Sequence, residues 1–502
     1  MKKIKKVYLL PIIFILTVSI TVSCTKEDRI FPDDADKTKN ETADENGNAK
    51  KELYIFEILP PNDFDGVTMK IYIPPNDENP VHKGTFAAVG TAGRYEEELT
   101  GEAFNDAVYN RNRRIEDEYN LRLEPVYGNN WDAAYKDISK DVLANDLRAD
   151  VYFTHVFRDI SPMVTGGYVR DWDAIPNIDL EKPWWNQTSI NNLSIANKIF
   201  LISGSVAIQD VILLAFNKGL IQDLAIESPY NLVRGGKWTL DKLNELASAA
   251  SFDLNGDGVF DPKDDRYGLA FCIDWHSPAL MYACNEISAT LDKDGYPHVE
   301  LITEKKIAAF EKIHGVLWEG NKTHRYNGNP SAGIPIDSGR VLFHGYNLFS
   351  VEKYLRASEI EYGILPLPKY DEKQENYMTC SWTGMYTLPL TINEAKFEMI
   401  GTVMESMAAL GHTDVIPVYH GILLKEKISR DDDSRDMLDI ILNNIVYDVG
   451  LVFEIGSSHP GNMIKLMFGN QEKIYVSEME KSMEKILLDY DNLYNTIRSL
   501  VN

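Results

Sequence analysis

Hydrophobic and polar residues alternate along the chain in segments that predict strands followed by helices. Four short apolar runs are typical of strands, at 70–73, 85–90, 121–127 and 149–154. The intervening segments 101–119 and 132–144 carry apolar residues at helical spacing. This order of elements predicts an α/β protein with a mostly parallel sheet covered by helices.

The segment 101–119 shows the helical pattern well. Phe104, Val108 and Ile115 fall on one face, which we expect to be buried. We expect the charged side chains of this segment to lie outside, namely Arg111, Arg113, Arg114 and Glu116.

The same alternation recurs further along the chain. Apolar runs at 198–203 and 211–217 predict strands, and 240–250 predicts a helix with Thr239 as its N-cap. The 502 residues are enough for two α/β lobes.

Residues 1–24 have the pattern of an export signal. A basic head with four lysines precedes an apolar run over 7–22, and Ser23 stands directly before Cys24. This resembles the bacterial lipobox, with Thr21 where Leu is more usual. We therefore expect 1–23 to be a lipoprotein signal peptide and Cys24 to be acylated. A secretory signal with an incidental Cys24 and a permanent membrane helix are the alternatives, although the run is short for a full span.

In segment 24–51, the lipobox resemblance implies a lipidated Cys24, and the residues after it are almost free of apolar side chains, which predicts a disordered tether. The expected location is the extracellular face of the cytoplasmic membrane. Without the four lysines of 1–23, the 51 basic residues become 47 against 76 acidic ones, a formal charge of −29. This charge argues against a nucleic-acid or anionic-lipid surface.

The cysteines beyond Cys24 are odd in number and lack metal-ligand spacing. They are Cys272, Cys284 and Cys380. We expect buried free thiols, with a Cys272–Cys284 disulfide as the alternative.

The segment 253–264 has the spacing of a calcium loop. Alternate residues offer oxygen ligands, and a glycine stands at the sixth position for the turn. The candidate ligands are Asp253, Asn255, Asp257, the main-chain carbonyl of Val259, Asp261 and Asp264. Asp264 has a shorter reach than the usual Glu at the twelfth position. We expect a structural Ca²⁺ here and no organic cofactor; a metal-free turn rich in Asp and Asn is the alternative.

Several segments, in a consistent order, resemble family 1 extracellular solute-binding proteins of bacterial ABC importers, the class that includes maltose-binding proteins. They are AFNDAVYNRNRRIEDEYN at 103–120, KPWWN at 182–186, FNKGL at 216–220, GKWTLDKL at 236–243, YGILPLPKYDEKQENY at 362–377 and MLDIILNNIVYD at 437–448.

The resemblance implies a two-lobe clamp of the type II periplasmic-binding-protein class, with a hinge and a ligand cleft between the lobes. By that pattern, 52–160 plus 326–383 form lobe 1, and 161–325 plus 384–502 form lobe 2. The implied function is capture of a small solute, a sugar or oligosaccharide in the first place, and its delivery to an ABC permease by a monomeric, lipid-anchored protein.

The resemblance and the ends of the predicted strands together suggest residues that bind the ligand. Sugars pack their C–H faces on flat aromatic rings and pair their hydroxyls with planar polar groups. The candidates are His155, Arg158, Asp159, Gln209, Asp210, Trp275, Tyr346 and Trp382. Tyr346 is balanced between hinge packing and the cleft. We interpret Trp184 and Trp185 as packing residues.

No GxSxG, HExxH or phosphate-binding GxxxxGK[ST] motif is present, which favours a binding protein over an enzyme. A glycosidase needs only two carboxylates, so a surface lipoprotein that acts on glycans is an alternative. A binding protein for peptides or other solutes and an adhesion protein are the others.

Overall fold

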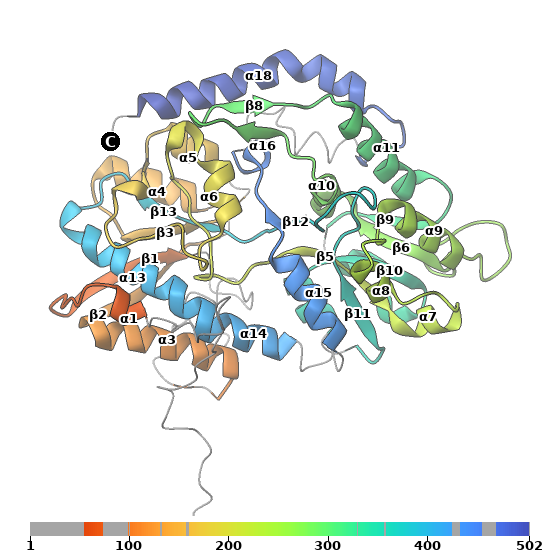
Figure 1. Ribbon diagram of the computed structural model, residues 1–502, viewed down its shortest axis with the longest axis horizontal. Coiled ribbons are helices and arrows are strands. Elements are labelled where there is room, and N and C mark those ends of the chain that lie inside the picture. The colour runs from red at the N-terminus through yellow and green to blue at the C-terminus, as the bar shows by residue number, and fades with distance from the viewer. Residues whose placement is uncertain are drawn as a thin grey trace, which may run out of the picture. The chain divides into compact units, whose positions relative to one another are not determined.

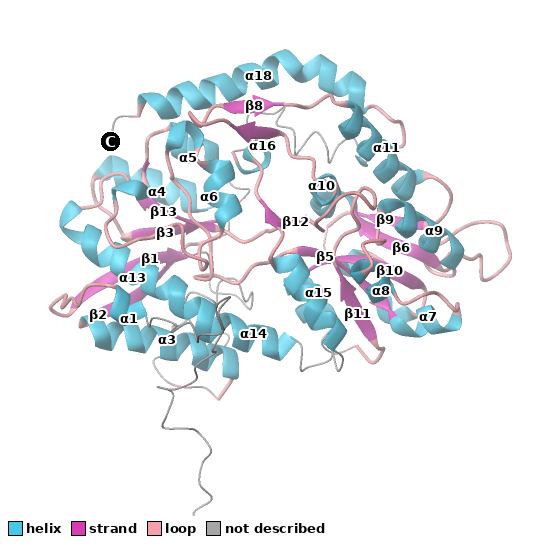
Figure 2. Ribbon diagram, viewed as in Figure 1, coloured by secondary structure: helices cyan, strands magenta, loops and turns pink. Residues whose placement is uncertain are grey.

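The structure is a computed structural model that describes residues 55–73, 99, 101–130, 133–156, 160–328, 330–355, 358–423, 432–453 and 468–500, without the side chains of Trp275 and Asp432. The strands of this part of the chain form two five-stranded sheets and two small two-stranded ones (Figure 2).

The first sheet has the strand order β2-β1-β3-β13-β4. β1 runs parallel to β2 and β3, and β13 runs antiparallel to β3 and β4. The strands are β1 Val67–Ile73, β2 Leu121–Tyr127, β3 Val151–Thr154, β4 Val169–Arg170 and β13 Met385–Pro389.

The second sheet has the order β11-β5-β10-β6-β9. β6, β9 and β10 are parallel, and β5 runs antiparallel to both β10 and β11. The strands are β5 Ile212–Asn217, β6 Tyr267–Cys272, β9 Thr323–Tyr326, β10 Val341–Asn347 and β11 Tyr362–Leu365.

Each sheet is packed against its own helices, and we call each sheet with its helices a lobe (Figure 1). The first lobe has α1 Ile55–Ile58, α3 Ala103–Tyr119, α4 Ala133–Ala144, α5 Ile160–Thr165 and α13 Phe397–Leu410. The second has α7 Lys218–Asp223, α8 Pro229–Arg234, α9 Leu240–Ala250, α10 Ile273–Ala283, α11 Glu304–Trp318, α12 Leu348–Leu355 and α15 Asp432–Leu442.

The remaining elements join or extend the two lobes. The small sheets pair β12 Thr379–Cys380 with β14 Ile445–Val446, and β7 Ala289–Leu291 with β8 Pro297–Val299. The other helices are α6 Gln187–Leu193, α14 Ile416–Leu423, α16 Val449–Val452 and α18 Tyr475–Ser499. The long helix α18 contacts both α5 and α11, and therefore touches both lobes.

Local features of the sequence predict several of these elements well. α9 begins after Thr239, whose side chain accepts a hydrogen bond from the N–H of Lys242, as an N-cap does. In α3, Phe104, Val108 and Ile115 are buried as expected.

The expected exposure of two charged residues in α3 is wrong. Arg111 is buried, and its guanidinium donates to the side chain of Asn112. Glu116 is also buried, because its carboxylate accepts the N–H of Leu123 on the adjacent strand β2 and pairs with Arg113 at 2.7 Å.

Of two further predicted strands, one is wrong and the other stays a prediction. Segment 198–203 forms no strand; only Ile202 makes an isolated bridge, to Tyr386. The strand expected at 85–90 lies outside the described residues, as do the signal peptide, Cys24 and the tether.

The α/β class and the two-lobe organisation are confirmed, but the expected lobe boundaries are wrong for the part of the chain after residue 160. Segment 326–383 was expected in the first lobe, yet β10 and β11 pair with β5 in the second sheet. Segment 384–502 was expected in the second lobe, yet β13 pairs with β3 in the first. Segment 161–325 is also divided, because β4 belongs to the first sheet.

Among the described residues, no helix combines the length and the apolar character that a membrane span requires.

Candidate functional site

The carboxyl ends of the parallel strands in both sheets lead to the segments that join the two lobes. Thr154, the last residue of β3, pairs with Met385 at the start of β13. Asn347, the last residue of β10, pairs with Ile212 at the start of β5. The chain therefore enters the second lobe and returns to the first at these carboxyl ends, where α/β proteins place their ligands. We call residues 203–211 and 379–384 the crossing segments.

The crossing segments are hydrogen-bonded to each other. The N–H of Trp382 donates to the carbonyl of Asp210 at 2.8 Å, and the N–H of Asp210 donates to Thr383 Oγ1 at 2.7 Å. The same Thr383 hydroxyl donates to the carbonyl of Ile208 at 2.8 Å. Val211 and Ser381 also form an antiparallel bridge. These bonds make the two connections one hydrogen-bonded unit.

The carboxylate of Asp210 is buried at this junction. It accepts hydrogen bonds from Asn347 Nδ2 at 2.6 Å and from the N–H of Phe349 at 2.9 Å. Burial raises the pKa of Asp210 to about 6, although both hydrogen bonds act in the opposite direction. Asp210 therefore ties a crossing segment to the end of β10 and the start of α12.

Gln209 is half-buried next to Asp210. Its Nε2 lies 3.4 Å from both Ser203 Oγ and the carbonyl oxygen of Gly204. The hydroxyl of Tyr447 donates to Gln209 Oε1 at 3.3 Å. These contacts are at the long end of the hydrogen-bond range, so the side-chain amide of Gln209 is held weakly.

His155 and Trp382 bring the first lobe and a crossing segment together. His155 follows β3, and its ring centroid lies 6.5 Å from that of Trp382, with the ring planes inclined at 54°. Both side chains are half-buried. The pair presents two flat aromatic groups at the carboxyl end of the first sheet, which suits the apolar face of a sugar ring.

The other sequence candidates differ in their positions. Trp275 lies in the first turn of α10, directly after β6, but its side chain is outside the described set. Arg158 and Asp159 lie outside the described residues. Tyr346 is buried at 2% exposure and stacks on His344, with centroids 4.2 Å apart, which fits the packing alternative.

Three polar residues near the strand ends at the crossing segments were not predicted from the sequence. Asn347 ends β10 and holds Asp210, and Tyr447 links Gln209 with Ser203. Asp274 follows β6 and accepts the N–H of Gly328 just after β9, at 3.0 Å. The end-of-strand rule that selected Trp275 would have selected Asn347 and Asp274, since both follow buried apolar runs. Nothing in the local sequence indicates Tyr447.

Trp184 and Trp185 pack in the first lobe, as predicted. Trp184 Nε1 donates to Glu405 Oε1 at 3.0 Å, and Trp185 Nε1 donates to Glu405 Oε2 at 2.8 Å. Glu405 lies on α13 and is buried, and this burial raises its pKa to about 7. The two indoles therefore share one buried carboxylate.

The calcium-like loop is folded by its own side chains. Asp253 accepts the N–H groups of Gly256 and Gly258, at 2.7 and 2.8 Å. Asn255 and Asp257 each accept the N–H two residues further on. Of the described residues, no three His, Cys, Asp or Glu side chains are placed together to hold a metal ion. Calcium binding by this loop stays a prediction.

The three cysteines of the second half of the chain are buried free thiols, as expected. Burial raises the pKa of Cys380 to about 12 and also raises that of Cys284, so these thiols are held in the neutral form.

Comparisons with known proteins bear on the fold. No protein-family model matches the sequence. No curated protein matches it either.

Solved structures do match. A cyclo/maltodextrin-binding protein complexed with maltotetraose is 14% identical with a TM-score of 0.54, and the match covers 87% of this chain and 98% of that chain. The fold is that of a two-lobe binding protein. An ABC substrate-binding protein from Listeria monocytogenes in complex with cycloalternan is 10% identical with a TM-score of 0.52, over 86% of this chain and 100% of that one. UgpB from Mycobacterium tuberculosis in complex with glycerophosphocholine is 12% identical with a TM-score of 0.54, over 78% and 97%.

Proposed function

We propose that this protein is a solute-binding protein that captures a carbohydrate and delivers it to an ABC permease. The observation that carries the proposal is the joining of the two lobes by hydrogen-bonded crossing segments at the carboxyl ends of both sheets. An aromatic pair stands at the same place, with His155 from the first lobe and Trp382 from a crossing segment. The fold is shared over nearly the whole length of binding proteins whose ligands include maltotetraose and cycloalternan.

Binding rather than catalysis is part of this proposal. Both oxygens of the buried carboxylate at the junction, Asp210, accept hydrogen bonds from the protein itself. A glycosidase needs one carboxyl group as acid and a second as base or nucleophile, each free to reach the sugar. Asp210 is committed to holding the hinge and supplies neither.

Lipid anchoring at Cys24 on the extracellular face of the membrane, and a monomeric state, complete the proposal. They rest on the sequence of 1–51 and on the resemblance to importer binding proteins.

A thermal-melt screen tests the ligand class. The protein without residues 1–51 is melted alone and with monosaccharides, oligosaccharides, polyols and peptides. A ligand that binds only the folded state increases the free energy of unfolding and so raises the melting midpoint. At a ligand concentration a hundred times the dissociation constant, the increase is about 2.7 kcal/mol. We expect at least one carbohydrate to raise the midpoint. A shift with a peptide and with no carbohydrate would contradict the carbohydrate assignment, and turnover of an oligosaccharide would contradict the binding role.

A further inference from the structure

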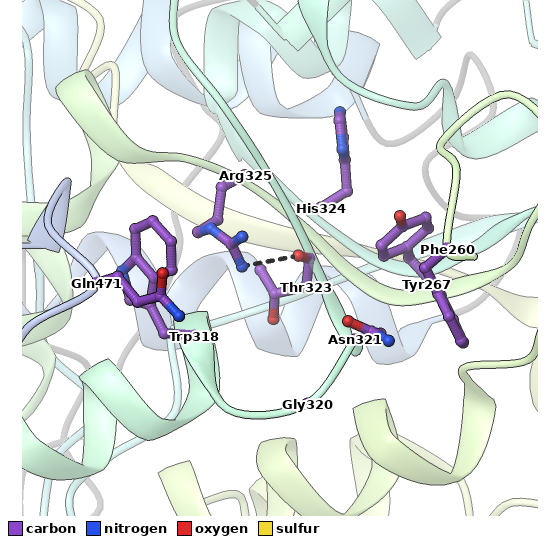
Figure 3. A pocket seen from close by; sticks show the side chains of 9 residues that line it. All are labelled: Phe260, Tyr267, Trp318, Gly320, Asn321, Thr323, His324, Arg325 and Gln471. Atoms are coloured by element: carbon purple, nitrogen blue, oxygen red, sulfur yellow. Dashed lines mark hydrogen bonds between the residues drawn. The ribbon is translucent and has the colours of Figure 1, made fainter. Parts of the chain in front are cut away.

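A hollow of about 300 Å³ lies in the second lobe, away from the crossing segments (Figure 3). Tyr267 and Thr323, the first residues of β6 and β9, both line it. Because these strands are parallel, the hollow lies at their amino ends, and the crossing segments lie at the opposite edge of the sheet. The hollow is therefore separate from the candidate ligand site between the lobes.

Arg325 supplies a positive charge to this hollow. Its guanidinium lies over the ring of Trp318, with Cζ 3.9 Å from the ring centroid. Nη1 donates to the carbonyls of Leu317 at 2.6 Å and Thr323 at 3.2 Å, the second of which is drawn in Figure 3. These two bonds and the stacking fix the plane of the guanidinium.

The charge of Arg325 has no carboxylate partner among the described residues. Nε and Nη2, which form one edge of the guanidinium, make no hydrogen bond to that part of the chain. By contrast, Arg234 pairs with both Asp433 and Asp436. Burial also lowers the pKa of Arg325, because a half-buried cation loses part of its hydration. In a chain with 76 acidic and 51 basic residues, acidic partners are not scarce.

We propose that this hollow is a second binding site, for a small carboxylate that pairs with the Nε–Nη2 edge of Arg325. A planar carboxylate matches that edge with two parallel hydrogen bonds. The rest of the lining suits a hydroxylated body. Asn321 and Gln471 bring amide groups, and Trp318, Tyr267 and Phe260 bring aromatic surface. A hexuronic acid combines these features, and its size suits a pocket of this volume.

Isothermal titration calorimetry of the full chain with glucuronate, glucose and inorganic phosphate tests the proposal. We expect saturable binding of glucuronate. Arg325→Gln should weaken it at least tenfold and leave any binding of glucose unchanged. Arg498→Gln, which removes an exposed arginine of α18, is the charge-matched control and should have no effect. Trp382→Ala, at the crossing segments, should also leave glucuronate affinity unchanged, so failure of this site and failure of the proposed carbohydrate site are distinguishable.

Four results would overturn the proposal. They are the absence of glucuronate binding, equal affinity in the Arg325→Gln and Arg498→Gln variants, loss of binding in Trp382→Ala, and tighter binding of phosphate than of glucuronate. If circular dichroism shows that Arg325→Gln does not fold, Arg325→Lys and Asn321→Ala decide. Arg325→Lys keeps the charge without the planar edge, and Asn321 is exposed. Both variants should weaken glucuronate binding severalfold, and unchanged affinity in both would overturn the proposal.

Discussion

Glu405 combines burial, two indole donors and a raised pKa in one side chain. Its carboxylate has no cationic partner among the described residues, and the hydrogen bonds from Trp184 and Trp185 only partly replace lost hydration. The folded state therefore holds a proton on Glu405 up to about pH 7, whereas the unfolded chain releases it near the ordinary value of 4.5. The stability that this proton contributes is complete below pH 4.5 and is lost as the pH rises to about 7.

We predict that Glu405→Gln removes this pH-dependent contribution. The melting temperature of the wild type minus that of the variant should fall by a few degrees from pH 5 to pH 8. This fall corresponds to a change in relative stability on the order of 2 kcal/mol. Differential scanning calorimetry in matched buffers measures it. Other titrating groups, such as Asp210 and the buried histidines, act in both proteins and cancel in the difference. Glu480→Gln, at an exposed position of α18, is the control and should show no such trend. A constant difference across the pH range would contradict the prediction.

Trp382 is the aromatic residue of the crossing segments, and its removal tests the proposed ligand site. In Trp382→Ala the ring that faces His155 is lost, while the N–H that bonds Asp210 is retained. We predict a dissociation constant for the best carbohydrate of the melt screen that is about 5 to 150 times higher, corresponding to about 1–3 kcal/mol. Calorimetric titration gives the value. Phe252→Ala, an exposed aromatic residue that precedes β6, should bind normally. Equal affinities of the two variants would remove Trp382 from the site.

At the scale of elements, local signals account for what the sequence predicted correctly. The Thr239 cap and the apolar face of α3 depend on residues within a few positions of one another. The burial of Glu116 depends instead on a contact with β2, which the periodicity of α3 does not contain.

The predicted lobe boundaries are wrong because they too depend on contacts between segments that are far apart in the sequence. Which sheet receives β13 depends on its pairing with β3, and Met385 and Thr154 are far apart in the sequence. Similarly, the sequence left Tyr346 balanced between hinge packing and the cleft, and the stacking of its ring on His344 inside the second lobe decides for packing only once the sheet is formed. The sequence can indicate which residues lie at the ends of strands. The direction in which each side chain points depends on how the strands pair in the sheet.

The loop 253–264 concentrates acidic side chains with no ion pair to Lys or Arg among the described residues. Each hydrogen bond from a backbone N–H occupies one acceptor site of a carboxylate, which has about four, so oxygen sites remain for a cation. Small movements of exposed side chains such as Asp257 would be needed to gather them.

We predict that calcium raises the melting temperature by a few degrees and that a chelator reverses the rise. Calcium binding to the folded state alone stabilises it by mass action. Asp253→Asn with Asp257→Asn should abolish the response, because the double variant loses two ligand charges. Asp294→Asn, in the exposed turn between β7 and β8, is the control with the same chemical change. Identical melts with calcium and with chelator, together with no bound calcium by elemental analysis, would leave the metal-free turn as the correct interpretation.

At the scale of the whole molecule, the connections restrict how the lobes can move. The crossing segments are bonded to each other through Asp210, Trp382 and Thr383, and α18 touches both lobes through α5 and α11. A hinge motion of the two lobes would use the crossing segments as its axis. Such a hinge lets a ligand favour one arrangement only if it binds that arrangement better, which requires contacts from both lobes.

The sequence of 1–51 adds a constraint on where such a hinge operates. We predict that residues 25–51 act as a polar tether; a flexible chain of this length would span about 30 Å on average and would keep the lobes near the membrane. We predict that Cys24→Ser releases the protein from the membrane fraction into the medium of the producing bacterium, because the thiol that carries the lipid is gone. Ser23→Ala keeps a small residue before the cysteine and should stay anchored. Fractionation followed by mass spectrometry of the mature N-terminus measures both, with a lipid mass on Cys24 expected for the wild type. An unmodified N-terminus at another residue would contradict the anchor, and delivery would then depend on diffusion of a free binding protein to its permease.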